Sequence, residues 1–181
     1  MAAQTHKERT LIIFKPDAVQ RGIVGEILAR FERAGLKIVA CKMAAPDEKH
    51  FFHHYETIGT MVSRHGKKIF EDTLNFMQDG PIVAYVLEGV EAVSLVRKMV
   101  GVTEPKSALP GTIRGDYAHL SYGHADEVGV GLTNIIHASG DSKEAKLEIK
   151  HWFSDREIFD YDTAHERFTM PKSKFSGKKR K

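Results

Sequence analysis

The sequence predicts an α+β fold in one main domain, and three observations lead there. Short apolar, β-branched runs alternate with longer segments whose apolar residues recur at helical spacing, and glycine or proline separates most of them. The length of 181 residues and the hydrophobic fraction of 41% suit one compact domain with a substantial core. The charged fraction of 28% is ordinary for globular proteins and argues against a disordered or fibrous chain.

The first half of the chain predicts a β-α-β unit followed by two helices. Pro16 stops the first strand, Gly35 closes the first helix, and Gly59 and Gly66 interrupt the later helical segments. The elements, in order, are a buried strand over 10–15, an amphipathic helix over 22–34, a strand over 36–44, and helices over 47–58 and 61–78.

The second half predicts two more strands, separated by a helix and a long loop. Residues 82–87 form a strand and residues 90–100 a helix, whereas residues 102–132 are rich in glycine and proline and are predicted to be largely loop. A loop of this length in a compact domain is usually functional. Residues 133–136 form the last strand, and Asp141 caps the helix that follows. Four strands in two βαβ-like halves predict a ferredoxin-like, split-βαβ fold, in which a four-stranded, mainly antiparallel sheet has helices packed on one face.

Charge is distributed unevenly along the chain. The formal net charge is +3, yet the last ten residues, 172–181, hold six positive charges and no acid. We therefore divide the chain into a folded domain over 1–170 and a basic tail without fixed structure over 171–181. Such a tail could touch RNA, DNA or an anionic membrane weakly. A solvated tail is the interpretation we favour, and we expect no specific nucleic-acid partner.

The chain shows no membrane or export signal. The longest apolar runs, 11–14 and 82–87, are far shorter than the roughly 20 residues that cross a bilayer. The polar amino terminus lacks the apolar segment of a signal peptide. These patterns predict a cytoplasmic protein without a membrane partner. The single cysteine, Cys41, excludes an internal disulfide and a cysteine metal cage, and its apolar surroundings predict a buried side chain.

Common nucleotide and metal motifs are absent from the sequence. No P-loop pattern occurs, and Gly129-Val-Gly131 lacks the third glycine of a dinucleotide fingerprint. Two histidine groups have spacing that a cation site could use, but no cysteine or HExxH pattern supports one, so packed or surface roles are favoured. These are His50, His53 and His54 on one predicted helix, and His119, His124, Asp126 and Glu127 in the long loop.

His137 stands where the last predicted strand gives way to small residues. Ser139 can bond locally, and Glu148 on the following helix could orient one ring nitrogen so that the other is an unprotonated nucleophile. The alternative is a packed structural histidine. The neighbours favour a nucleophile with an orienting acid.

Three cations are placed at the ends or edges of separate predicted elements. Lys15 follows the first strand, Arg97 lies on the helix before the long loop, and Arg114 lies inside that loop between glycines. Each alone would be interpreted as a surface charge or an ion pair. Together they predict a polyphosphate site, because arginine forks match phosphate oxygens and flanking glycines let the backbone approach an anion.

Several motifs follow one another in an order that a known family shares. They are Glu8-Arg9-Thr10, Phe14-Lys15-Pro16-Asp17, Gln20-Arg21-Gly22, Gly80-Pro81, Leu87-Glu88-Gly89, Pro110-Gly-Thr-Ile-Arg-Gly-Asp116 and Asn134-Ile-Ile-His-Ala-Ser139. On these residues the chain closely resembles nucleoside diphosphate kinases, from about residue 8 to near residue 168.

The resemblance implies a ferredoxin-like fold and a homo-oligomer, with a hexamer favoured and a tetramer possible. It implies a ping-pong reaction in which ATP phosphorylates His137 and a second nucleoside diphosphate takes the phosphoryl group. This reaction supplies CTP, GTP, UTP and deoxynucleoside triphosphates. Mg²⁺ is expected to be bound mainly through the nucleotide phosphates, with few or no protein ligands.

The resemblance also assigns roles to individual positions. These are Lys15 beside the sugar hydroxyl and phosphates, Tyr55 near the nucleophile, Arg97, Thr103 and Arg114 on the phosphates, Asn134 on the sugar, and Ser139 and Glu148 supporting His137.

The sequence departs from the family pattern in four places. The stretches between Tyr55 and Gly80 and between Arg114 and Asn134 are longer than expected, and the inserted loop 122–131 could supply a subunit contact. Ile69 falls where the family places a base-stacking phenylalanine. Gly140 replaces an acid, and we expect Asp141 to serve instead. These departures leave open a second hypothesis, a nucleotide-binding relative without catalysis.

Overall fold

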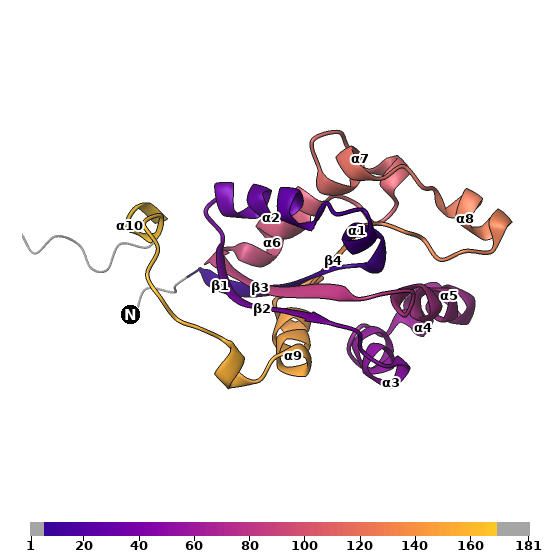
Figure 1. Ribbon diagram of the computed structural model, residues 1–181, viewed down its shortest axis with the longest axis horizontal. Helices are drawn as coiled ribbons and strands as arrows, with labels where there is room; N and C mark the ends of the chain where they lie inside the picture. Colours follow the sequence, from indigo (N-terminus) through magenta and orange to yellow (C-terminus); the bar gives the residue numbers. More distant parts are fainter. Residues whose placement is uncertain (1–5, 170–181) are drawn as a thin grey trace, which may run out of the picture.

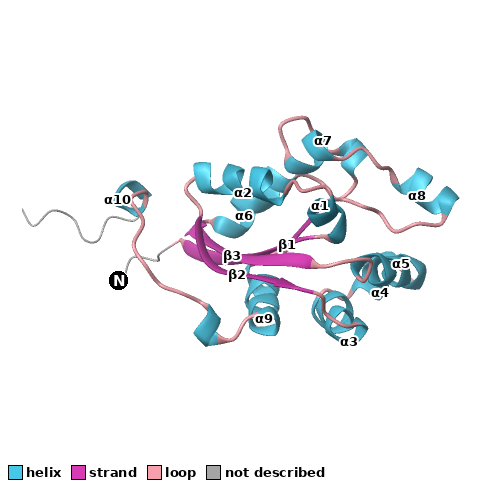
Figure 2. Cartoon of the chain, viewed as in Figure 1, coloured by secondary structure: helices cyan, strands magenta, loops and turns pink. Residues whose placement is uncertain are grey.

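The computed structural model describes residues 6–169, and a four-stranded sheet forms its middle layer (Figure 2). The strand order is β2-β3-β1-β4, and each neighbouring pair is antiparallel. The strands are β1 (Lys7–Phe14), β2 (Lys37–Ala44), β3 (Ile82–Val90) and β4 (Ile136–Ala138). The prediction of a four-stranded antiparallel sheet in an α+β fold is confirmed. The predicted tail over 171–181 lies outside the described residues.

Helices cover both faces of this sheet (Figure 1). On one side lie α1 (Pro16–Gln20), α2 (Val24–Arg33), α6 (Ala92–Val100) and α7 (Ile113–Tyr117). On the other side lie α3 (Glu48–Phe52), the π-helical turn η1 (His53–Ile58), α4 (Met61–His65), α5 (Lys67–Met77) and α9 (Ser142–Trp152). The remaining helical turns are η2 (Pro105–Ser107), α8 (Tyr122–Val128), η3 (Asp155–Glu157) and α10 (Glu166–Thr169).

The expectation of helices on one face is wrong, and the side chains of β1 show why. Leu11 and Ile13 pack into one hydrophobic core with α3, α5 and α9, whereas Ile12 and Phe14 pack into a second core with α2 and α6. All four side chains are completely buried. Since successive side chains of a strand point to opposite faces, an unbroken apolar run requires cover on both sides.

Other corrections concern element bounds and one side chain. The segment 102–132, predicted to be largely loop, also contains the short helices α7 and α8, whose N-caps Thr112 and Ser121 accept hydrogen bonds from backbone N–H groups. The last strand covers residues 136–138 and not 133–136. Cys41 is exposed and not buried, because its side chain lies on the open face of the edge strand β2.

The segment that follows α9 runs along β2. The Phe159 backbone N–H donates to the Val39 carbonyl at 2.8 Å, and the Tyr161 hydroxyl donates to the Ile38 carbonyl at 2.6 Å. This segment therefore satisfies part of the sheet edge that β2 would otherwise leave open. Within residues 6–169, no helix has the length and apolar character needed to cross a membrane.

Candidate active site

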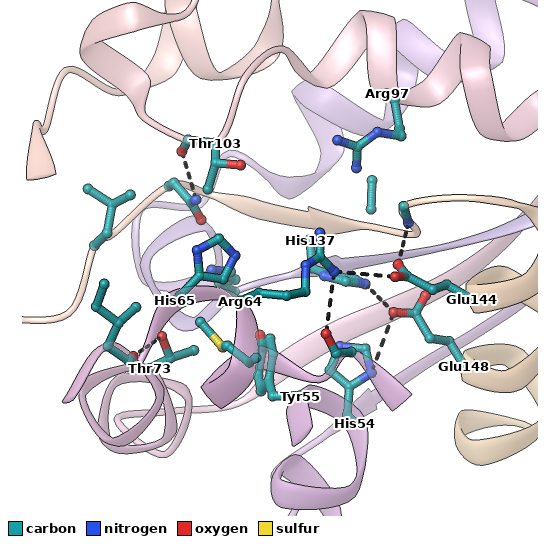
Figure 3. A pocket seen from close by; sticks show the side chains of 18 of the residues that line it. His54, Tyr55, Arg64, His65, Thr73, Arg97, Thr103, His137, Glu144 and Glu148 are labelled. Carbon is teal, nitrogen blue, oxygen red and sulfur yellow. Dashed lines mark hydrogen bonds and ion pairs between the residues drawn. The ribbon is translucent and has the colours of Figure 1, made fainter. Parts of the chain in front are cut away.

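A cavity of about 190 Å³ lies where β1 and β4 end, and segments distant in sequence line it (Figure 3). Every predicted site residue except Ser139 contributes to its wall. The wall consists of Lys15, His54, Tyr55, Gly59, Met61, Arg64, His65, Ile69, Thr73, Arg97, Thr103, Arg114, Tyr122, Leu132, Asn134, His137, Ala138, Gly140, Glu144 and Glu148.

His137 lies in the middle of β4, and the backbone just before it is strained. Ile135 has a φ of +72°, a left-handed conformation that is rare for a β-branched residue. The Lys15 N–H donates to the Ile135 carbonyl at 2.9 Å, and the Ile135 N–H donates to Asp17 Oδ2 at 3.0 Å. The turn between β1 and α1 therefore holds the strained residue. Because of this conformation, β4 begins only at Ile136, whereas the sequence pattern predicted a strand that begins at residue 133.

The His137 ring is oriented by a buried acid. His137 Nε2 lies 2.9 Å from Glu148 Oε1, and the Ser139 hydroxyl donates to Glu148 Oε2 at 2.5 Å. Ser139 Oγ also accepts from the Leu11 N–H at 3.1 Å, which fixes it to β1. Glu148 is only 2% exposed. Since Nε2 is engaged, Nδ1 is the ring nitrogen left for a substrate.

Two further aromatic groups pack beside His137. Its ring lies edge-on to those of His54 and Tyr55, with centroids 4.6 and 6.3 Å away. Trp152 Nε1 donates to His54 Nδ1 at 3.2 Å. Burial, followed by the nearby His137, lowers the pKa of His54 well below its usual value. The sequence left His54 without an assigned role, although it stands beside Tyr55 and shares a predicted helix face with His50 and His53.

His54, His137 and Glu148 also offer the kinds of atoms that bind metals, and these atoms lie within 4.8 Å of one another. The atoms are already engaged in the bonds with Trp152 and between His137 and Glu148. We therefore interpret the group as a hydrogen-bonded network.

The other candidate histidines do not join such a group. His50 and His53 stack on His151 outside the cavity, with ring centroids 3.9 and 4.5 Å away. In the part of the chain that the structure describes, the histidines and acids of the loop form no metal-type cluster.

Three cations of the wall, Lys15, Arg97 and Arg114, are called the cavity cations below. They meet at this wall although Lys15 follows β1, Arg97 lies on α6 and Arg114 on α7. Burial and then the nearby Arg114 lower the pKa of Lys15 to about 8. Burial and then Arg97 lower the pKa of Arg114 to about 10. Burial is the larger cause of both shifts, and the next cause in each is another cation of the same wall. An anionic ligand would favour the charged forms of both side chains.

Arg114 also holds the surrounding backbone in place. Its guanidinium donates to the carbonyls of Gly101, Asn134 and Ile136 at 3.0, 3.2 and 2.6 Å. These bonds join α7 to the end of α6 and to the strained approach to β4. Three hydrogen bonds therefore hold the Arg114 guanidinium at the cavity wall, and two of its five N–H donors are left over.

Several buried polar atoms of the wall lack partners among the described residues. Asn134 Nδ2 donates to the Thr103 carbonyl at 2.9 Å, but its Oδ1 has none. The same is true of Tyr55 Oη and His54 Nε2. Because buried polar groups are normally bonded, these atoms indicate a place where a polar ligand belongs.

The far end of the cavity is mainly apolar. Ile69, Met61 and Leu132 line it together with His65 and Thr73. The Thr73 hydroxyl donates to the Ile69 carbonyl at 2.7 Å, so it is satisfied within α5. This end suits a flat apolar group such as a nucleobase.

Asp141 and Glu144, the two acids that follow Gly140, both accept hydrogen bonds from backbone N–H groups. Asp141 caps α9 by accepting from the N–H groups of Lys143 and Glu144. Glu144 reaches back to the Gly140 N–H at 3.0 Å and to Arg64 at 3.3 Å. As the N-cap of α9, Asp141 uses Oδ1 for both of its bonds. The expectation that Asp141 serves in place of the missing acid stays a prediction.

The inserted loop contributes to the cavity itself. Tyr122, the first residue of α8, lines the wall near Arg114. Its backbone N–H donates to Glu104 Oε1 at 2.9 Å, and the Lys106 N–H donates to the Leu120 carbonyl at 3.2 Å. The insertion is thereby fixed to the loop that carries Thr103.

Comparison with known proteins decides the family. The family model described as nucleoside diphosphate kinase matches residues 8–158. The chain belongs to the nucleoside diphosphate kinase family. The nucleoside diphosphate kinase of Borreliella burgdorferi is 44% identical over 154 residues, which cover 85% of this chain and 92% of that protein. That of Pyrococcus abyssi is 44% identical over 169 residues, covering 91% and 96%.

Solved structures of the family share this fold. The transition-state mimic of the Borrelia burgdorferi kinase with bound vanadate and ADP has a TM-score of 0.88 and 42% identity, covering 91% of this chain and 98% of that one. The Halobacterium salinarum kinase in complex with CDP has a TM-score of 0.74 and 38% identity, covering 88% and 95%. The predicted family, fold class and enzyme class are confirmed: the chain is a nucleoside diphosphate kinase, a phosphotransferase.

Proposed function

We propose that the enzyme transfers the terminal phosphoryl group of a nucleoside triphosphate, typically ATP, to a nucleoside diphosphate through a phosphohistidine at His137. The observation that carries this proposal is the His137–Glu148 bond at 2.9 Å, placed at a cavity lined by Lys15, Arg97 and Arg114. A nucleophile with an oriented ring and three cations around it meet the needs of phosphoryl transfer.

The first half-reaction forms one bond and breaks one. The Nδ1 lone pair of His137 attacks the terminal phosphorus, and the bond from that phosphorus to its bridging oxygen breaks, so that the diphosphate leaves with the electron pair. Glu148 stabilises the positive charge that develops on the ring through Nε2–H, and Ser139 holds Glu148 in place. A second nucleoside diphosphate then attacks the phosphohistidine and reverses these changes.

The cavity cations and Thr103 bind the nucleotide phosphates. Their charges neutralise the oxygens of the transferring group, where charge develops in the transition state. Tyr55 borders the nucleophile, and burial followed by the nearby Glu148 raises its pKa, so the hydroxyl stays protonated and can donate a hydrogen bond.

The nucleoside would lie across the remaining wall. The unpartnered Asn134 Oδ1 suits a sugar hydroxyl, together with Lys15, and Ile69 provides an aliphatic surface for the base. The relatives bound to ADP and to CDP support a site that accepts both purine and pyrimidine nucleotides. Such breadth fits a supply of CTP, GTP, UTP and deoxynucleoside triphosphates.

Mg²⁺ would enter as part of the nucleotide, held by phosphate oxygens. The donor set fits this arrangement, because both carboxylates of the wall are engaged, Glu148 with His137 and Glu144 with Arg64. When bound, the ion neutralises phosphate charge and helps to align the reacting group. The cavity cations position the phosphates that carry it.

Oligomer state and location remain predictions. A homo-oligomer, a hexamer in preference to a tetramer, is expected from the family resemblance, and light scattering would give the number of subunits. A cytoplasmic location and the lack of a specific nucleic-acid partner are expected from the sequence. A gel-shift assay with and without residues 171–181 would test the latter.

Labelling with terminally labelled ATP and Mg²⁺ tests the proposed function. Wild-type protein should form an acid-labile, base-stable phosphoprotein, and added GDP should remove the label as GTP. His137→Ala should form none. A labelled His137→Ala, or an unlabelled wild type that still binds ATP, would contradict the mechanism, and the latter would favour a nucleotide-binding relative without catalysis.

A further inference from the structure

His54 is a buried histidine that the mechanism above does not use. It lies in the π-helical turn η1 with 1% of its surface exposed, between β4 and α9. Its Nδ1 is 3.9 Å from Glu148 Oε1, the same oxygen that lies 2.9 Å from His137 Nε2. Two imidazoles therefore face one carboxylate oxygen, and only one of them is close enough to bond it (Figure 3).

Trp152 determines which imidazole makes that bond. The indole N–H is only a donor, so the 3.2 Å bond to His54 Nδ1 requires that nitrogen to be an acceptor. The His54 proton is then on Nε2, on the side away from Glu148. With both oxygens of Glu148 taken by His137 and Ser139, the carboxylate is fully committed to the nucleophile.

The surroundings of His54 keep the ring neutral. His50 on α3, His151 on α9, His137 on β4 and Lys15 after β1 all disfavour a second positive charge, and burial acts in the same direction. Glu148 is the acid that opposes them, at 3.9 Å. The balance lowers the pKa of His54 well below its usual value.

We propose that His54 is a positioning residue: held as the neutral Nε2–H tautomer by Trp152, it reserves Glu148 for His137 and supports the nucleophile's ring edge-on. The inference rests on the proposed role of His137. A proton on His54 Nδ1 would allow a charge-assisted bond to Glu148, which would compete with His137 and misalign Nδ1 of the nucleophile. Misplacing a reacting group by about 1 Å can cost on the order of 100-fold in rate.

The test compares pH profiles of kcat in four full-length variants. Trp152→Phe removes the donor, so we expect kcat to fall about 10-fold at acidic pH, with the acid limb moved to higher pH and KM for nucleotides unchanged. His54→Asn keeps an acceptor near the Nδ1 position but cannot be protonated. Because it also loses the edge-on contact with His137, its kcat should be lower than that of wild type at every pH, while the acid limb stays where it is in wild type. Lys150→Gln, an exposed position on α9 two residues from Trp152 and outside the cavity wall, is the matched control and should behave as wild type.

The double variant Trp152→Phe/His54→Asn separates tautomer control from packing. Tautomer control predicts that the shifted acid limb disappears, because no ring remains to be protonated. A shift that persists in the double variant, or a Trp152→Phe profile identical to wild type, would overturn the proposal. Circular dichroism checks that each variant is folded.

Wild-type phosphohistidine formation is measured alongside these profiles. If wild type forms none, the proposed function fails; if it forms normally and the profiles do not differ, only the role of His54 fails.

Discussion

Two buried lysines lie at opposite ends of the sheet, and their surroundings differ. Lys37, at the start of β2, lies 3.3 Å from Glu88 on β3, and Glu88 also meets Lys7 at 2.6 Å and Arg9 at 2.7 Å. Lys15, after the end of β1, instead has Arg114 for a neighbour. Lys37 is 5% exposed and Lys15 7%, so burial does not distinguish them.

The two lysines differ in the charged groups that surround them. Burial lowers the pKa of Lys37, but hydrogen bonds to Asp160 and Glu88 more than offset it and raise the pKa. At Lys15, burial and Arg114 act together and lower the pKa to about 8. The group around Glu88 is complete within the chain and serves the fold. At Lys15 and Arg114, in contrast, a neighbouring cation adds to the effect of burial, and groups perturbed in this way are common at functional sites.

Removing one arginine from each end should produce the largest contrast. Arg114→Gln should lower kcat about 100- to 1,000-fold, corresponding to about 2.7–4 kcal/mol of transition-state stabilisation. Arg9→Gln, at the other end, should leave kcat unchanged. Steady-state kinetics with ATP and a nucleoside diphosphate measures both. Equal losses in the two variants would contradict the contrast, because the loss of activity would not depend on the cavity.

Replacing each lysine by methionine should change stability in opposite directions. Lys37→Met leaves Glu88 with fewer buried partners and should destabilise the fold by about 1–3 kcal/mol. Lys15→Met removes an unpaired buried charge, so stability should hold or rise while activity is lost. Urea unfolding at pH 7 gives both free energies. A Lys15→Met variant less stable than Lys37→Met would refute the contrast.

Nucleotide binding should be accompanied by proton uptake at Lys15. Because its folded pKa of about 8 lies below the ordinary value of 10.5, the unfolded chain binds more protons between these pH values, and stability should rise with pH across that window. Bound phosphates favour the charged lysine and raise its pKa. Calorimetry of ADP binding at pH 8.5 in buffers of different ionisation enthalpy should show uptake in wild type and less in Lys15→Met. Identical uptake would assign the proton to another group.

The smallest expected effect concerns the base. Ile69→Phe would give the apolar end of the cavity an aromatic surface, and stacking should lower KM by an amount equivalent to about 0.5–1.5 kcal/mol while kcat changes little. Substrate titrations with GDP and CDP measure this change. An unchanged KM for both would place the base away from Ile69.

Local patterns predicted much of this structure. The apolar run at 11–14 predicted β1. The short spacing from His137 to Ser139 and Glu148 predicted that these residues meet, because they lie in β4, directly after it and in α9. The same run also indicated that helices cover both faces of the sheet, because four consecutive buried apolar residues of a strand cannot all point to one face.

Contacts between residues that are far apart in the sequence could not be predicted from such local patterns. His54 and Trp152 are 98 positions apart, and their bond exists only because η1 and α9 pack on the same face. The left-handed turn at Ile135, which shifted the start of β4, depends on bonds to Lys15 and Asp17. The entry of Tyr122 into the cavity wall likewise follows from its attachment to Glu104.

The most direct test of the account is to identify which nitrogen carries the phosphoryl group. Phosphorylated enzyme, prepared with ATP and Mg²⁺, would be examined by ³¹P NMR, which distinguishes the two phosphohistidine isomers. Because Glu148 holds Nε2 at 2.9 Å, the account predicts a single species phosphorylated on Nδ1 of His137. Phosphate on Nε2, or on Ser139, would contradict it.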